Sequence, residues 1–271
     1  MPYYFVKVEE SPITFPYLRK FNLSMGILHL IQGIIMIVIG SNLDFSRDIY
    51  TFYLKFEAVN SQSNQFTIAP NPTVQFTFDF VGVWIASFLF LSAIAHLLIA
   101  GPLFNFYVKN LKEKFNPIRW FEYALSSSVM IVFIAILFGI WDFWTLFILF
   151  FVNALMNLFG YSMELQNKDR DKVDWTNYIF GWIAGVVPWI VITSYFLNIQ
   201  SIGGEVPWFV YWIYAVEILL FNCFAINMFL QYKRWGKWQD YLYGERMYQI
   251  LSLVAKTLLA WLVFAGVFQP G

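Results

Sequence analysis

The sequence contains few charged residues. Asp, Glu, Lys and Arg make up only 13% of its 271 residues, whereas 59% are hydrophobic and 22% are aromatic. A soluble domain of this length carries about twice that share of charge. The composition therefore excludes an ordinary soluble globular domain and indicates a membrane protein.

Other features are scarce or missing. The chain has one cysteine, Cys223, which excludes an intrachain disulfide. Acidic and basic residues number 17 each, so the formal net charge of zero gives no sign of a nucleic-acid partner. The first 20 residues hold five charged residues and no apolar core, so we expect no cleavable signal peptide. No internal repeat or low-complexity segment stands out, which predicts a single domain over residues 1–271.

Long apolar segments dominate what is present. Seven of them are close to the roughly 20 residues that cross a bilayer as a helix. They cover residues 22–42, 81–104, 119–141, 144–164, 174–198, 207–232 and 247–268. Only a short turn at Asp142 separates the third from the fourth. The sequence therefore predicts an all-α membrane protein, a bundle of seven transmembrane helices.

The positive charges predict how the bundle is oriented. Of the 17 Lys and Arg residues, fourteen lie in the N-terminal arm or in and beside the connections after the second, fourth and sixth segments. The connection after the first segment has only Arg47 and Lys55. Cytoplasmic loops are enriched in positive charge. We therefore expect a multi-pass protein of the cell membrane with a cytoplasmic N-terminus and an extracellular C-terminus.

The connection between the first two segments, about residues 43–80, is long and predicted to be extracellular. Its runs Tyr50–Phe56 and Val74–Phe80 are rich in strand-forming residues and flank a stretch of Ser, Asn, Gln and Pro. Two such runs indicate a β-hairpin. The apolar face of this hairpin needs cover, either from its own bundle or from a second protomer of a homodimer, and the sequence leaves both open.

Ionisable residues inside the apolar segments mark a candidate site. Lys256 lies within the last segment, where a charge is costly and indicates function. In a dry pocket a lysine can also lose its proton and condense with an aldehyde. Counted from the segment ends, His29, His96 and Lys256 are all roughly 10–14 Å deep on the cytoplasmic side, and Glu122 is near the same end. Glu217 is roughly 22 Å from that end, on the outer side of Lys256.

Each of these residues also has a simpler interpretation. A histidine in a membrane can merely hydrogen-bond a neighbouring helix. Glu122 can pair with Arg119 across one turn. Lys256 can extend its ammonium group to the interface if the helix is shifted. Glu217 can be protonated and inactive, or it can relay protons outward.

Seven helices with a lysine in the last one resemble the retinal-binding rhodopsins, and the details are similar to heliorhodopsins. The resemblance rests on the stretches Arg119–Ser128 and Leu251–Lys256, together with His29 and His96. The long outer loop and the predicted inverted topology agree with it, and it covers essentially the whole chain.

This resemblance implies a role for each candidate residue. Lys256 would hold all-trans retinal as a protonated Schiff base, Glu122 would be its counterion, and Arg119 would complete the charge balance one turn away. Ser252 would hydrogen-bond the Schiff base or the counterion. A polar network on the cytoplasmic side would join His29 and His96 to two serines, Ser92 and Ser126. The residues expected to line the polyene are Tyr123, Met130, Asn153, Met156 and Trp261.

The resemblance further implies a photoreceptor in the lipid bilayer and not an enzyme, with neither catalytic residues nor a metal. Light would isomerise the retinal, and the resulting conformational signal would reach a cytoplasmic partner. Light-activated proton transport through Glu217 stays open, although Ser126, Ser127, Ser128 and Met130 stand where typical pumps carry further carboxylates. A third possibility is a seven-helix carrier or receptor that binds an anionic ligand through Lys256.

Overall fold

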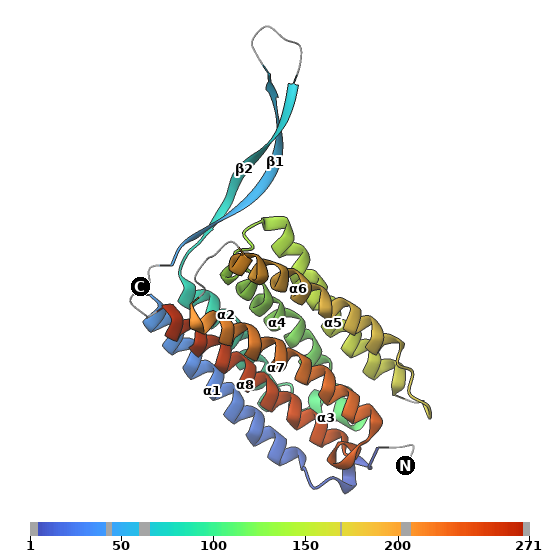
Figure 1. Cartoon of the computed structure of the whole chain (residues 1–271). Coiled ribbons are helices and arrows are strands. Elements are labelled where there is room, and N and C mark those ends of the chain that lie inside the picture. The colour runs from blue at the N-terminus through green and yellow to red at the C-terminus, as the bar shows by residue number, and fades with distance from the viewer. Residues whose placement is uncertain (1–4, 42–44, 60–65, 169, 202–206, 268–271) are drawn as a thin grey trace.

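The computed structural model describes residues 5–41, 45–59, 66–168, 170–201 and 207–267. Within these residues seven helices are long and apolar enough to cross a membrane, and they pack side by side as one bundle (Figure 1). They are α1 (Phe15–Gly40), α2 (Val81–Ala100), α4 (Pro117–Leu137), α5 (Phe143–Asn167), α6 (Thr176–Ser201), α7 (Trp208–Lys233) and α8 (Tyr241–Val267). The predicted seven-helix membrane bundle is confirmed.

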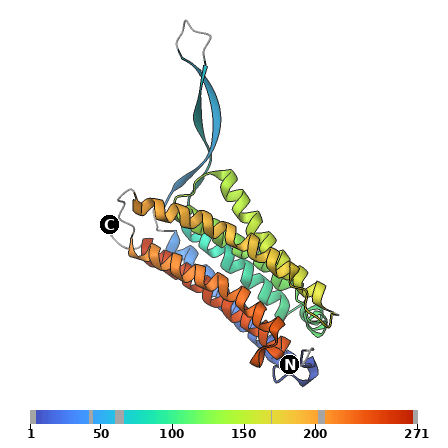
Figure 2. The same cartoon turned by 45° about the vertical axis from the view of Figure 1, so that its right-hand side comes forward.

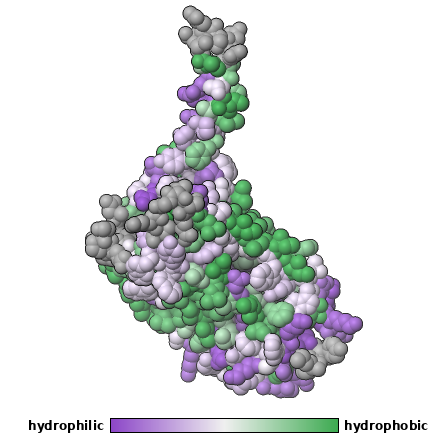
Figure 3. Space-filling model, in the orientation of Figure 1, coloured by the Kyte–Doolittle hydropathy of each residue, from purple (hydrophilic) through white to green (hydrophobic). Residues whose placement is uncertain are grey.

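The surface of the bundle matches a bilayer environment. Large apolar side chains such as Val38, Ile190 and Leu219 are exposed on the outside of the helices. In Figure 3 apolar residues cover the middle of the visible face, and hydrophilic residues gather at its lower end, where the N-terminus lies in Figure 1. The protein is therefore a multi-pass membrane protein whose outward-facing apolar side chains contact lipid.

Several helices begin before the apolar segments that predicted them. Thr14 caps α1 by accepting a hydrogen bond from the backbone N–H of Tyr17 at 3.3 Å, so α1 starts at Phe15 instead of residue 22. The last helix starts at Tyr241, six residues before the predicted segment. The first turns of these helices contain polar residues, so a search for continuous apolar segments does not include them. Residues 42 and 268, where the first and last predicted segments end, lie outside the described residues.

The predicted end of the second segment, residue 104, is wrong. Helix α2 stops at Ala100, before Gly101 and Pro102, because proline cannot donate the backbone hydrogen bond that would continue it. A short amphipathic helix follows, α3 (Phe104–Lys112), at the end of the bundle that carries the N-terminus (Figure 1). It buries Tyr107 and leaves Lys109 exposed.

Helices α1 and α2 approach each other closely at two glycines. A Cβ atom on Gly82 would clash with the carbonyl oxygen of Met36 and with the Cα atom of Gly40. Small residues allow such close packing of helix backbones in membranes. This contact holds the two helices that carry the histidines His29 and His96 against each other.

The predicted β-hairpin between the first two transmembrane helices is confirmed. Strands β1 (Arg47–Ala58) and β2 (Phe66–Phe78) pair antiparallel, with an irregularity between Ile49 and Tyr50. The backbone N–H of Tyr50 donates to the carbonyl of Trp141 at 2.8 Å and ties the hairpin base to the α4–α5 connection. Both views show the strands projecting away from the helices (Figures 1 and 2). A hairpin folded over its own bundle is therefore excluded for the described strands; residues 60–65 lie outside them.

Candidate functional site

Lys256 and Glu122 form a buried ion pair between α8 and α4. The Lys256 side chain is 4% exposed, and its Nζ lies 3.3 Å from Glu122 Oε1. Nζ also donates to Ser252 Oγ at 2.7 Å, and Ser92 of α2 donates to the same Glu122 oxygen at 2.6 Å. Side chains from three helices thus hold one ammonium group and one carboxylate. This geometry excludes a Lys256 side chain that extends to the interface.

The two histidines of the chain lie together between α1 and α2. The rings of His29 in α1 and His96 in α2 stack with centroids 5.7 Å apart and planes inclined by 10°. His96 Nδ1 is 2.8 Å from Asn22 Oδ1, which is a hydrogen bond between α2 and α1. The ring nitrogens of His29 and the hydroxyl of Ser126 are buried and have no hydrogen-bond partner among the described residues. The structure therefore brings the histidines together but does not join Ser126 to them.

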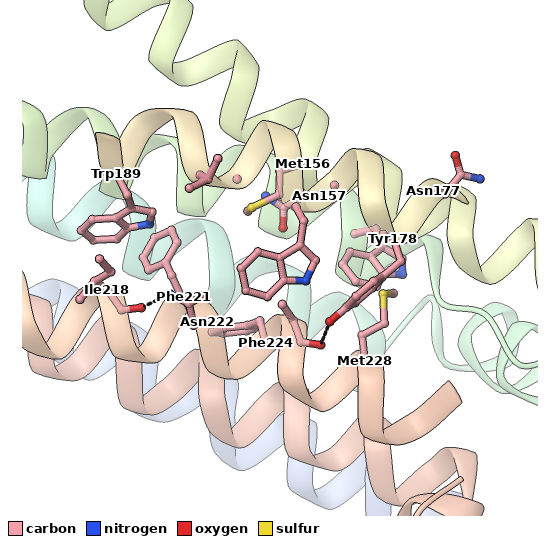
Figure 4. Close-up of a pocket in the computed structure, with 17 residues that line it drawn as sticks. Met156, Asn157, Asn177, Tyr178, Trp189, Ile218, Phe221, Asn222, Phe224 and Met228 are labelled. Carbon is pink, nitrogen blue, oxygen red and sulfur yellow. Dashed lines mark hydrogen bonds between the residues drawn. The ribbon is translucent and has the colours of Figure 1, made fainter. Parts of the chain in front are cut away.

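A cavity begins at Lys256. It has an empty volume of about 390 Å³, and its lining includes Tyr123, Met130 and Met156. A larger cavity of about 830 Å³ lies between α5, α6 and α7 (Figure 4), and the two cavities share the wall residues Met156 and Phe224. Such a mostly apolar void with few polar groups is typical of a small-molecule site. A buried amine at one end of it fits an elongated apolar aldehyde.

Two of the residues predicted to line the polyene do not line this cavity. Asn153 instead donates to the hydroxyls of Ser127 and Ser128, at 2.8 and 3.1 Å, and joins α5 to α4. Trp261 is 40% exposed on the outside of α8. Five residues turn a helix by about 140° beyond a full turn, so Trp261 cannot share the face of Lys256.

Aromatic residues of α6 and α7 take the place expected for Trp261. Trp182 and Trp189 line the larger cavity, and Phe221 and Phe224 line both cavities. Sequence reasoning missed these four residues because α6 and α7 are apolar around most of their circumference. No pattern in the sequence separated their inward face from the face toward lipid.

The prediction that Arg119 completes the charge balance of Glu122 is wrong. Its guanidinium group pairs with Glu164 of α5 and Glu245 of α8, and all three side chains are at most 3% exposed. The alternative pairing of Arg119 with Glu122 across one turn is wrong for the same reason. Sequence reasoning missed Glu164 and Glu245 because they fall at the edges of apolar segments, where charged residues are ordinary. The signal that could have found them is that each lies about one helical turn from a transmembrane end.

Glu217 is buried in α7, but it is not on the outer side of Lys256. Asn227 of α7 donates to the carbonyl of Gly244 in α8 at 3.2 Å, and the rings of Phe224 and Tyr248 are 6.3 Å apart. This antiparallel register places Glu217 at the level of Lys256. The predicted depth was wrong because α8 begins six residues earlier than its apolar segment. Neither carboxyl oxygen of Glu217 has a hydrogen-bond partner in the described part of the chain.

The sequence was compared with protein-family models and with curated proteins. The family model of the heliorhodopsins matches residues 18–268, which is nearly the whole chain. No curated protein matches the sequence.

Proposed function

The chain belongs to the heliorhodopsin family of seven-helix retinal proteins, and we propose that it is a light sensor in which Lys256 binds all-trans retinal. One observation carries this proposal: the buried Lys256 nitrogen lies 3.3 Å from a carboxylate and at the end of an apolar cavity. Retinal, when bound, supplies a polyene that changes shape on absorbing light. The roles below belong to the residues of this chain.

Glu122 acts as the counterion of the Lys256 nitrogen. A buried positive charge needs a nearby anion because its hydration has been lost. Ser92 holds Glu122 Oε1 by donating to it, and Ser252 holds the nitrogen by accepting a hydrogen bond from it. Glu122 is also the carboxylate in contact with this nitrogen and can accept a proton that leaves it. His96, one turn from Ser92 on α2, extends the polar region toward α1.

The walls of the cavity fix the polyene. Tyr123, Met130 and Phe221 line the cavity that contains the lysine, and Trp189 lines the larger cavity next to it. Figure 4 shows Trp189 and Phe221 side by side in the larger cavity, with ring centroids 5.5 Å apart. Aromatic and thioether side chains give such a pocket a dry, shaped wall.

The output of the sensor is a conformational signal to a cytoplasmic partner. We propose a cytoplasmic N-terminus and an extracellular C-terminus, since fourteen basic residues lie on the side of the N-terminal arm and two lie on the other. We also propose a homodimer. On the projecting hairpin Leu54, Phe56 and Phe66 are each about two-thirds exposed, and a second protomer would cover them.

A second candidate function is light-activated proton transport. Glu217 favours it, because a buried carboxyl group without a described partner is expected to be protonated and so holds a transferable proton. Whole-cell recording under illumination separates the two functions. A pure sensor gives no steady current. A sustained proton current that disappears in Glu217→Gln would replace sensing by transport.

Addition of all-trans retinal to the purified apoprotein tests the primary proposal. We expect a visible absorption band in the parent and in Lys109→Ala, a control that removes an exposed lysine of α3. We expect none in Lys256→Ala, nor in Lys256→Arg, which keeps the charge but cannot condense with the aldehyde. A band in either Lys256 variant would refute the assignment. A parent that forms no band would favour a carrier or receptor that binds an anionic ligand at Lys256.

A further inference from the structure

Arg119 lies at the centre of a buried ionic cluster that spans three transmembrane helices. Its two carboxylate partners accept several neutral hydrogen bonds as well. Glu164 accepts from Trp120 Nε1 at 2.6 Å, from the backbone N–H of Asn116 at 3.0 Å and from the Tyr241 hydroxyl at 3.1 Å. Four donors including Arg119 therefore satisfy this carboxylate as an anion.

Glu245 is satisfied in the same way. Its Oε1 accepts from Asn116 Nδ2 at 2.8 Å, from the Tyr107 hydroxyl at 3.2 Å and from Gln249 Nε2 at 3.3 Å. Arg119 binds its other oxygen. The cluster thus fastens α4, α5 and α8 to one another through almost completely buried charged groups, and the Tyr107 hydroxyl joins α3 to it.

The same two helices, α4 and α8, carry both this cluster and the retinal site. Glu245, Tyr248, Ser252 and Lys256 are spaced three or four residues apart and so share one face of α8. Three side-chain bridges cross from that face to α4: Arg119 to Glu245, the Tyr123 hydroxyl to the carbonyl of Tyr248 at 2.8 Å, and Glu122 to Lys256 at 3.3 Å. The first and last bridges are eleven residues apart along α8, or about 16 Å.

Aromatic packing joins these bridges into one unit. The Arg119 guanidinium lies 4.2 Å from the centroid of the Tyr248 ring, and the Lys256 nitrogen lies 5.2 Å from that of Tyr123. Trp120 packs on Tyr248 at 5.6 Å, and it is seated so closely on Gly160 of α5 that a Cβ there would clash with its ring. Close-packed side chains of this kind transmit small displacements instead of absorbing them.

We propose that the bridge between Arg119 and Glu245 is a positioning site, which fixes the register of α8 against α4 and thereby sets the Lys256 nitrogen against Glu122. This inference rests on the proposed retinal site. The cluster acts through position and not as part of the counterion, since its carboxylates face Arg119 and not the lysine. A slip of α8 along α4 would lengthen the Lys256–Glu122 contact and weaken the electrostatic interaction between them.

Two matched substitutions test the proposal in the retinal-bound protein. Glu245→Gln removes the charge that links α8 to Arg119, whereas Glu164→Gln removes an equal charge from α5 and leaves the α4–α8 bridge in place. Each variant leaves one carboxylate to balance Arg119, so both are expected to fold. The measurements are the absorption maximum and the pH at which half of the visible band is lost.

We expect Glu245→Gln to move that midpoint downward by about one pH unit, a tenfold change in the equilibrium, and to shift the absorption maximum. Glu164→Gln should change both much less. Tyr123→Phe, which removes the middle bridge, should move the midpoint in the same direction as Glu245→Gln. In the double variant that combines Tyr123→Phe with Glu245→Gln, the midpoint shift should differ from the sum of the two single shifts.

Three outcomes would overturn the positioning role. They are a parent-like spectrum and titration in Glu245→Gln, equal shifts in Glu245→Gln and Glu164→Gln, and strict additivity with Tyr123→Phe. Equal shifts would mean that the lost charge acts only through its electric field. Failure of the retinal site itself is seen separately, because the parent would then show no visible band.

Discussion

Replacing Arg119 by glutamine should destabilise the protein more than any surface substitution. Arg119 is the cation that contacts two buried carboxylates, Glu164 and Glu245, each almost completely removed from solvent. Removing one partner of a buried ion pair typically costs about 3–5 kcal/mol, because the remaining charge has neither water nor a counter-charge. Here one substitution leaves two such carboxylates.

The neutral donors around the cluster limit the loss. Glu164 keeps its hydrogen bonds from Trp120 and Tyr241, and Glu245 keeps those from Tyr107 and Gln249. The costs at the two carboxylates are also not additive, since both belong to one network. We therefore expect a total loss of about 3–5 kcal/mol for Arg119→Gln. At about 2–4 °C per kcal/mol for a chain of this size, the melting temperature should fall by about 6–20 °C.

Thermal unfolding of the detergent-solubilised protein, followed by circular dichroism, measures this loss without requiring retinal. Arg119→Gln combined with Glu245→Gln should recover part of the stability, because only one buried carboxylate then lacks a charged partner. Glu113→Gln is the matched surface control. The Lys168 ammonium lowers the pKa of Glu113. Because solvent screens this ion pair, its loss should leave the melting temperature unchanged. A fall of less than about 3 °C for Arg119→Gln would refute the argument, since it corresponds to about 1 kcal/mol.

Three further predictions test the site and the topology. Glu122→Gln should shift the visible band to longer wavelength or abolish it, because the counterion charge is lost; an unchanged absorbance titration would place the counterion elsewhere. A protease should remove a tag at Gly271 from intact cells and reach one at Met1 only after permeabilisation, and protection of the Gly271 tag would contradict the orientation. Trp189→Ala should reduce pigment formation or shift its band, whereas Trp261→Ala should change neither, and the reverse result would show that the cavity is not where retinal binds.

The features that could be predicted from the sequence are those with strong local signals. A run of about 20 apolar residues has few alternatives to a membrane helix, and alternation between 74 and 80 identified the second hairpin strand. Lys256 stood out because a charge inside such a run is rare, and the structure pairs it with Glu122. The partners of Arg119 could not be predicted, because Glu164 and Glu245 are 45 and 126 residues away and only the packing of three helices brings them together.

Which face of a helix points inward was the harder question, and the reason is physical. In water an amphipathic helix shows its buried face as an apolar stripe. In a bilayer the lipid is as apolar as the protein interior, so Trp261 facing lipid and Trp189 facing the cavity look alike in the sequence. Small and polar residues carry the information instead, because they allow close packing or need a partner inside the bundle. By that criterion the walls of the larger cavity are indicated better by small and polar residues than by aromatic ones. These residues are Asn157 and Gly160 of α5 and Gly185 of α6, and all three line the cavity.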